Sequence, residues 1–135
     1  MTITRMNPDG LHKTPGYSHV TVVEAGRTAF LAGQCPLDET GALVGDGDLD
    51  AQVDQIVANA MTALAAVNAR PEQVVRSVIY VVVSQDTTAL GGVWQRLLDS
   101  PLAAAFTTAS TLLGVARLGF AGQLVELDLT AALGA

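Results

Sequence analysis

The sequence has few aromatic residues, one cysteine and little positive charge. Phe, Trp and Tyr make up 4% of the 135 residues. A single cysteine excludes an intramolecular disulfide and a metal site built from several thiolates. Seven Lys and Arg oppose 13 Asp and Glu, so the net charge is −6. Because no basic cluster is present to bind a phosphate backbone, we expect no nucleic-acid partner.

Long hydrophobic runs are also missing. No apolar run approaches the roughly 20 residues that span a bilayer, and residues 1–10 are polar, unlike a signal peptide. Half of the residues are nevertheless apolar and only 15% are charged, which favours one folded domain over 1–135 and excludes disorder. We expect a cytoplasmic protein without membrane contact. The mean hydropathy of +0.39 indicates self-association as a way to hide apolar surface.

The hydrophobic pattern predicts strands and helices in alternation. Residues 1–15 form a polar leader broken by glycine and proline. Apolar residues at helical spacing predict a long helix from Asp48 or Asp50 to Asn68, and a weaker helix is predicted over 87–98. Strands are predicted over 20–24, 28–32, 74–83, 106–115 and 123–131. A tight turn at Ala25-Gly26 would join the first two as a hairpin.

The predicted order is therefore β-β-α-β-α-β-β, which is typical of the α+β class. We expect a single mixed sheet with the helices on one face. The continuous β-branched run over 74–83 favours a central strand covered on both faces. Oligomerisation through the sheet would cover the face that the helices leave open.

Spacing alone gives few candidates for chemistry. Cys35 is either a thiolate nucleophile or, more commonly in proteins, a small buried side chain. His19 is either a general base or a hydrogen-bonded surface histidine, and His12 lies in the polar leader. No close cluster of His, Asp and Glu predicts a metal site. The glycine-rich segment 41–47 lacks the flanking strand and helix of a phosphate loop, so we expect an ordinary loop.

The last predicted strand carries two carboxylates among apolar residues. Glu126 and Asp128 are two residues apart, so both point to the same face of a strand. Burying an unpaired carboxylate is costly. The pair therefore faces solvent or another subunit, or it lines a cleft in which a carboxylate accepts a proton or orients water.

Segments along nearly the whole chain, from about Pro15 to Thr130, resemble the RidA family, which is also called YjgF and often labelled endoribonuclease L-PSP. The segments that carry the resemblance are 15–18 (PGYS), 30–38 (FLAGQCPLD) followed by Gly41, 79–81 (IYV) with Asp86 and 93–94 (VW), 114–118 (GVARL) and 124–127 (LVEL). The resemblance implies a chorismate-mutase-like α+β fold and a homotrimer with a cleft between each pair of subunits. It also implies that no cofactor is needed.

The resemblance further implies a set of site residues. In archetypal members, the cleft hydrolyses 2-imino or enamine acids to 2-keto acids and ammonia. There an arginine forks the substrate carboxylate, and a glutamate with backbone groups positions the attacking water. Tyr17 matches the cleft tyrosine and Glu126 matches this glutamate, so both are predicted to be catalytic. The residues predicted to line the substrate site are Ala32, Gly33, Gly91, Ser110 and Thr111.

The chain departs from the family at three of these positions. Ala32 stands where serine is common, Gly91 where asparagine is expected, and Ser110 where the arginine is expected. Residues 101–113 contain no Arg or Lys, so no shift of the alignment restores the fork, and Arg117 fits a different family position.

We therefore predict a RidA-like protein without archetypal imine deaminase activity, whose cleft binds a small metabolite that is neutral or less acidic, or performs different chemistry with Tyr17, Ser110 and Glu126. The alternative is residual hydrolysis of 2-imino or enamine acids, in which Glu126 positions water. The endoribonuclease of the older label is a third hypothesis, which the acidic charge disfavours.

Overall fold

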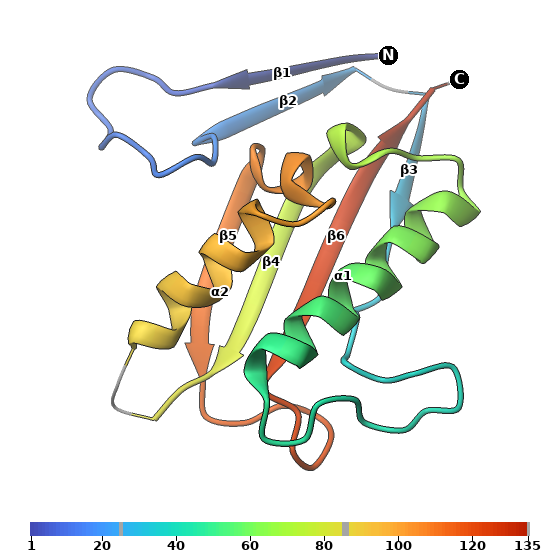
Figure 1. Cartoon of the computed structure of the whole chain (residues 1–135). Coiled ribbons are helices and arrows are strands. Elements are labelled where there is room, and N and C mark those ends of the chain that lie inside the picture. The colour runs from blue at the N-terminus through green and yellow to red at the C-terminus, as the bar shows by residue number, and fades with distance from the viewer. Residues whose placement is uncertain (25, 85–86, 135) are drawn as a thin grey trace.

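The structure, a computed structural model, describes residues 1–24, 26–84 and 87–134 (Figure 1). Its strands are β1 (Thr2–Met6), β2 (Val20–Glu24), β3 (Arg27–Phe30), β4 (Val74–Val82), β5 (Ala109–Val115) and β6 (Val125–Leu133). Its helices are α1 (Leu49–Ala66) and α2 (Thr88–Leu98), with short 3-10 turns η1 (Pro71–Gln73) and η2 (Ala103–Phe106). Both α-helices cover the same face of the main sheet (Figure 1).

The main sheet has four strands in the order β3-β6-β4-β5. Strand β4 is parallel to β5 and antiparallel to β6, and β3 is antiparallel to β6. The sheet is therefore mixed, and the predicted α+β class with both helices on one face is confirmed. The register places Tyr80 between Glu126 and Leu113, so these three side chains share one face of the sheet.

Helix α1 forms where the sequence predicts it. The Asp48 carboxylate caps the helix by accepting the backbone N–H of Ala51 at 3.1 Å. One side of the helix packs against β6, which is its main partner in the sheet. The apolar residues that it buries are Val53, Ile56, Val57, Ala60 and Leu64. The core thus lies between the helices and the sheet, where Ile79, Leu127 and Phe106 are fully buried.

The N-terminal part of the chain differs from the prediction. Residues 2–6, predicted as part of the polar leader, form β1, which pairs with β2 in a separate two-stranded ribbon. The guanidinium of Arg5 fixes this strand by donating to the carbonyl oxygens of Glu72 and Val74, at 2.6 and 3.1 Å. Residues 2–6 form a strand because they pair with β2, and the sequence of this segment alone does not indicate that pairing.

The predicted hairpin of the first two predicted strands is wrong. Ala25 of its turn lies outside the described residues, but β2 pairs with β1 while β3 pairs with β6. Of the predicted single sheet, β3, β4, β5 and β6 form the main sheet, and β2 belongs to the ribbon across one end of it (Figure 1). Local β propensity identified these strands but not their partners.

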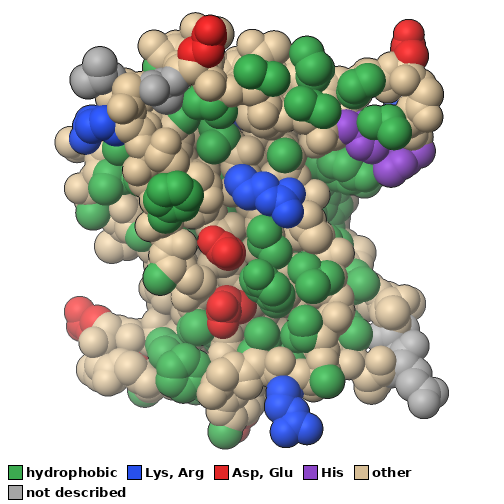
Figure 2. Space-filling view, turned by 180° about the vertical axis from the view of Figure 1, so that it is seen from behind, with side chains coloured by type: hydrophobic (Ala, Val, Ile, Leu, Met, Phe, Trp, Pro, Cys, Tyr) green, Lys and Arg blue, Asp and Glu red, His purple; other side chains and the backbone are tan. Residues whose placement is uncertain are grey.

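The sheet face opposite the helices is uncovered in the single chain, so the predicted cover of β4 on both faces is not present within it. Figure 2 shows this side, with charged side chains among hydrophobic ones. Phe30 in β3 is 80% exposed there and stands opposite Thr130. We call this surface the open sheet face. Its other members are Arg76, Val78, Tyr80, Val82, Thr111, Leu113, Val115, Glu126, Asp128 and Thr130.

Candidate functional site

The predicted site residues fall into two groups on opposite faces of the sheet. Tyr17, Gly91 and Ser110 meet in a pocket beside α2. Glu126 lies on the open sheet face and is in contact with the backbone of Gly33. Ser110 pairs with Ser77 of β4, which is buried on the helix side of the sheet, whereas Glu126 pairs with Tyr80 of β4, which lies on the opposite face. The two groups therefore do not meet within one chain.

The first group forms a pocket of about 430 Å³, which we call the α2 pocket. Its lining residues are Pro15, Tyr17, Gly91, Trp94, Ser110 and Leu112. They come from the segment before β2, from α2 and from β5. The rings of Tyr17 and Trp94 meet edge to face with centroids 6.3 Å apart, so the wall is largely aromatic and aliphatic. Among the described residues, no Lys or Arg lines this pocket.

Ser110 uses its hydroxyl within the protein. Its Oγ accepts a hydrogen bond from Ser77 Oγ at 2.6 Å and donates to the carbonyl oxygen of Thr108 at 3.1 Å. Ser77 is fully buried, so its hydroxyl group holds the hydroxyl group of Ser110 in place. The position at which the family resemblance implies an arginine therefore supplies neither a charge nor a second donor to the pocket.

The hydroxyl of Tyr17 is bonded to a residue to which the sequence analysis gave no role. His12 Nε2 lies 2.6 Å from Tyr17 Oη, and either atom can donate. His19 in turn donates from Nε2 to the carbonyl oxygen of His12 at 2.7 Å, and the two imidazole rings meet edge to face. His19 is thus a hydrogen-bonded histidine, as its more ordinary interpretation predicts. The only sequence signal for His12 was its nearness to Tyr17 in the chain.

The second group surrounds the carboxylate of Glu126. Cys35 Sγ donates to Glu126 Oε1 at 3.3 Å, and Gln123 Nε2 donates to the same oxygen at 3.0 Å. A Cβ on Gly33 would lie 2.2 Å from Glu126 Oε2, so only glycine fits there without moving the carboxylate. We call Gly33, Cys35 and Gln123 the Glu126 cradle. The sequence analysis predicted Gly33 and Glu126 but missed Gln123.

Cys35 is a thiol, not a thiolate, at neutral pH. Burial raises the pKa of Cys35 to about 11, with further contributions from the hydrogen bond to Glu126 and from the charge of Glu126. The nucleophile interpretation of Cys35 is therefore disfavoured, since a reactive cysteine needs a lowered pKa. In this state the sulfur acts as a hydrogen-bond donor.

The remaining predicted residues belong to neither the α2 pocket nor the Glu126 cradle, although Ala32 directly precedes Gly33 in the chain. Thr111 is on the open sheet face, where its Oγ1 accepts a hydrogen bond from Arg76 at 2.8 Å. Ala32 lines a shallow groove that also includes Phe30. Neither residue contacts the α2 pocket, so their predicted binding roles stay predictions.

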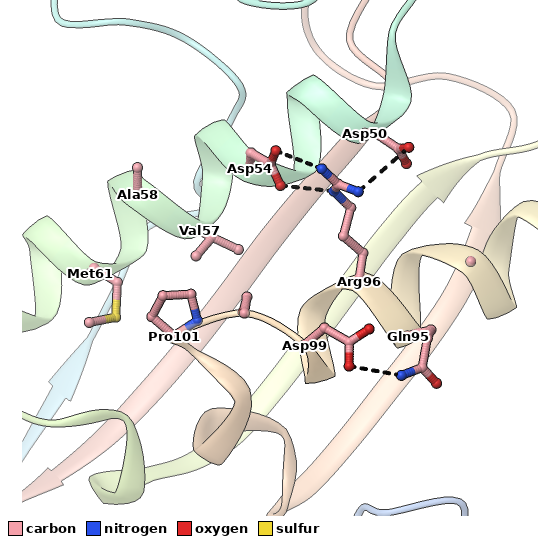
Figure 3. Close-up of a pocket in the computed structure, with 11 residues that line it drawn as sticks. Asp50, Asp54, Val57, Ala58, Met61, Gln95, Arg96, Asp99 and Pro101 are labelled. Atoms are coloured by element: carbon pink, nitrogen blue, oxygen red, sulfur yellow. Dashed lines mark hydrogen bonds and ion pairs between the residues drawn. The ribbon is translucent and has the colours of Figure 1, made fainter.

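The groove between α1 and α2 is a larger hollow of about 840 Å³ (Figure 3). Arg96 of α2 forks the carboxylate of Asp54 in α1, with both N–O distances 2.8 Å, and lies 3.6 Å from Asp50. The hydrogen bond from Arg96 lowers the pKa of Asp54. Because two carboxylates neutralise this arginine, the groove offers no free cation for an anionic ligand.

In the part of the chain that the structure describes, no group of three or more His, Cys, Asp or Glu side chains is arranged to hold a metal ion. Neither α-helix there is both long and apolar enough to cross a membrane.

Comparisons with known proteins agree on one family. The family model for endoribonuclease L-PSP matches residues 9–133. The chain is 33% identical to protein DfrA of Myxococcus xanthus over 97 residues, which are 71% of this chain and 74% of DfrA.

Solved structures give the same result. A protein of the Rid family from Yersinia pestis, YyfB, is 32% identical and superposes with a TM-score of 0.86, covering 98% of this chain and 100% of YyfB. The Mycobacterium tuberculosis protein Rv2704 of the YjgF family shares the fold at 23% identity, with a TM-score of 0.64, over 98% of this chain and 100% of its own length. These likenesses confirm the chorismate-mutase-like α+β fold. The chain therefore belongs to the endoribonuclease L-PSP family, the RidA or YjgF family that its sequence resembles.

Proposed function

We propose that three copies of this chain assemble through the open sheet face into a homotrimer with a ligand-binding cleft between neighbouring copies. In this arrangement, the α2 pocket of one copy meets the Glu126 cradle of the next. The proposal is supported by the division of the predicted site residues between opposite faces of one sheet. Neither group alone combines a pocket with a carboxylate.

The composition of the open sheet face supports self-association. Phe30, 80% exposed, is the most exposed large hydrophobic residue of the described chain. Val78, Tyr80 and Leu113 continue the apolar surface across the strands. An apolar surface of this kind on a folded domain is typical of a contact between subunits.

We propose further that the cleft binds a small neutral or weakly acidic metabolite and lacks archetypal imine deaminase activity. The observation that carries this proposal is the α2 pocket, where Ser110 stands at the arginine position and no Lys or Arg lines the wall. A ligand carboxylate would lose a charge-assisted contact worth about 1.5–3 kcal/mol. Glu126 would add repulsion to a ligand of the same charge.

The cleft residues then have distinct roles. The aromatic wall of Tyr17 and Trp94 packs against an apolar part of the ligand. The Tyr17 hydroxyl, bonded to His12, forms a hydrogen bond with a polar part of it. Glu126 accepts a hydrogen bond from the ligand or from water. No cofactor enters this scheme, and the cytoplasm stays the predicted compartment.

The second candidate function is residual hydrolysis of imino or enamine acids. It is favoured by one observation, the carboxylate of Glu126, which is anchored at Oε1 and able to accept a proton from water at Oε2. The endoribonuclease activity in the family's label finds no support in the net charge of −6.

The experiment that tests the proposal measures release of keto acid from 2-aminoacrylate or 2-iminopropionate generated in situ, beside a no-protein control. We expect no acceleration by the wild-type protein. Ser110→Arg restores a forked donor and should create activity, whereas Ser110→Lys supplies the same charge without bidentate geometry and should give less. Rapid hydrolysis by the wild type would contradict the proposal and favour the deaminase.

A further inference from the structure

The two oxygens of the Glu126 carboxylate have unequal surroundings. Oε1 accepts hydrogen bonds from both Cys35 Sγ and Gln123 Nε2, at 3.3 and 3.0 Å. Within the described residues, Oε2 accepts no hydrogen bond and lies against the backbone of Gly33. The carboxylate is therefore anchored at one oxygen, and among the described residues the other oxygen has no donor.

Hydrogen bonds hold the side-chain amide of Gln123, which donates to Glu126, in a fixed position. Its side chain is buried, with 4% exposure. Its Oε1 accepts the backbone N–H of Phe120 at 3.2 Å, and its Nε2 also donates to the carbonyl oxygen of Val125 at 3.1 Å. A side-chain amide fixed at both ends cannot turn away from Glu126 without breaking buried hydrogen bonds, which is costly.

Cys35 is held over β6 by its neighbours. The backbone of Gln34 exchanges hydrogen bonds with that of Leu127, at 2.6 and 3.1 Å. The carbonyl oxygen of Cys35 accepts the side-chain amide of Asn59 in α1 at 3.0 Å. The thiol is thus fixed from two sides next to the Glu126 carboxylate.

We propose that Cys35 and Gln123 are positioning residues that saturate Oε1 of Glu126, so that Oε2 alone meets the ligand or water in the cleft. This inference rests on the proposed function, in which Glu126 is the acceptor of the cleft. The arrangement requires a protonated thiol, because a thiolate cannot donate and would repel the carboxylate. The raised pKa of Cys35, about 11, agrees with this requirement.

The first test follows the thiol itself, which is the only cysteine of the chain. Thiolate absorbance is titrated against pH in the wild type and in Glu126→Gln. Glu126→Gln should lower the pKa of Cys35 only part of the way toward 9.0, because burial, the largest cause, remains.

The second test follows the carboxylate. The chain has four glutamates, so protein labelled with carbon-13 at the glutamate carboxyl carbons gives a simple spectrum in which Glu126→Gln identifies the Glu126 signal. Cys35→Ala should shift this signal, and Cys35→Ser, which keeps a donor, should restore it. Gln123→Met should also shift this signal, because it removes the second donor to Oε1. If Gln123→Met does not fold, the two Cys35 variants carry the test alone.

An unchanged Glu126 signal in Cys35→Ala, or a Cys35 pKa that Glu126→Gln does not lower, would overturn the inference. Neither readout uses a ligand. Failure here is therefore separate from failure of the proposed function, which the keto acid assay reports.

Discussion

The contact between Gly33 and Glu126 predicts that Gly33→Ala lowers the free energy of unfolding when Glu126 is present and raises it when Glu126 is truncated. A Cβ on Gly33 would lie 2.2, 2.9 and 3.3 Å from Oε2, Cδ and Cγ of Glu126. Gly33 has no left-handed backbone, so alanine can adopt its conformation. In Gly33→Ala, the carboxylate must therefore turn out of the cradle and lose its contacts with Cys35 and Gln123.

The magnitude follows from the two lost hydrogen bonds. A buried hydrogen bond to a charged group is worth about 1.5–3 kcal/mol. Because Glu126 is only half-buried, we take about 1.5–3 kcal/mol for the two hydrogen bonds together. Alanine recovers about 0.4–1 kcal/mol by restricting the unfolded chain. Gly33→Ala should thus lower the free energy of unfolding by about 0.5–2.6 kcal/mol.

The same substitution should have the opposite effect once Glu126 is truncated. Glu126→Ala removes the three atoms that a Cβ on Gly33 would approach most closely, so adding Gly33→Ala should raise the free energy of unfolding by about 0.4–1 kcal/mol. The coupling free energy between the two sites is then about 1.5–3 kcal/mol.

The assay is chemical denaturation of the wild type, both single variants and the double variant at equal protomer concentration, because assembly stabilises the folded state. Gly92→Ala is a matched control, since a Cβ at Gly92 meets no atom within 4 Å. It should stabilise α2 by about 0.5–1 kcal/mol whether or not Glu126 is present. An equal loss from Gly33→Ala in both backgrounds would refute the reasoning.

Three other predictions concern the assembly and the helices. Phe30→Asp should abolish self-association, because it places a charge on an apolar contact surface; light scattering showing an unchanged mass would speak against this. Asp54→Asn should flatten the acid side of the stability-pH curve. Arg96 lowers the pKa of Asp54 in the folded protein, so the ion pair stabilises the fold slightly at pH values above the pKa that Asp54 has in the unfolded chain. This stabilisation is lost as the pH falls through the lower pKa of Asp54 in the folded protein. Asp48→Ala should cost about 1 kcal/mol in urea denaturation, since it removes the cap on Ala51 N–H; no change in midpoint would argue against the cap.

Local signals in the sequence predicted the elements that depend on local physics. The run of apolar residues behind Asp48 predicted α1 to within two residues, because the cap and the helical spacing are both encoded there. The β-branched run predicted β4 equally well. Strand β1 was missed because pairing with β2 and anchoring of Arg5 on η1 and β4, not its own pattern, keep residues 2–6 extended.

The site was predictable only in part. The resemblance pointed to Gly33 and Glu126, which the fold brings into contact although 93 positions separate their numbers. Cys35 and Gln123 gave no signal of a joint role, because a hydrogen bond between distant segments leaves no local periodicity. The bond between His12 and Tyr17 was missed for a related reason, since irregular chain connects them and no spacing rule applies.

The central claim is that the α2 pocket and the Glu126 cradle, on opposite faces of one sheet, meet only between copies of the chain. The most direct measurement is the mass of the purified protein by light scattering coupled to size exclusion. We expect three times the chain mass of 13.9 kDa. A stable particle with the mass of one chain would contradict it, because the two groups of residues would then have no means of forming a common cleft.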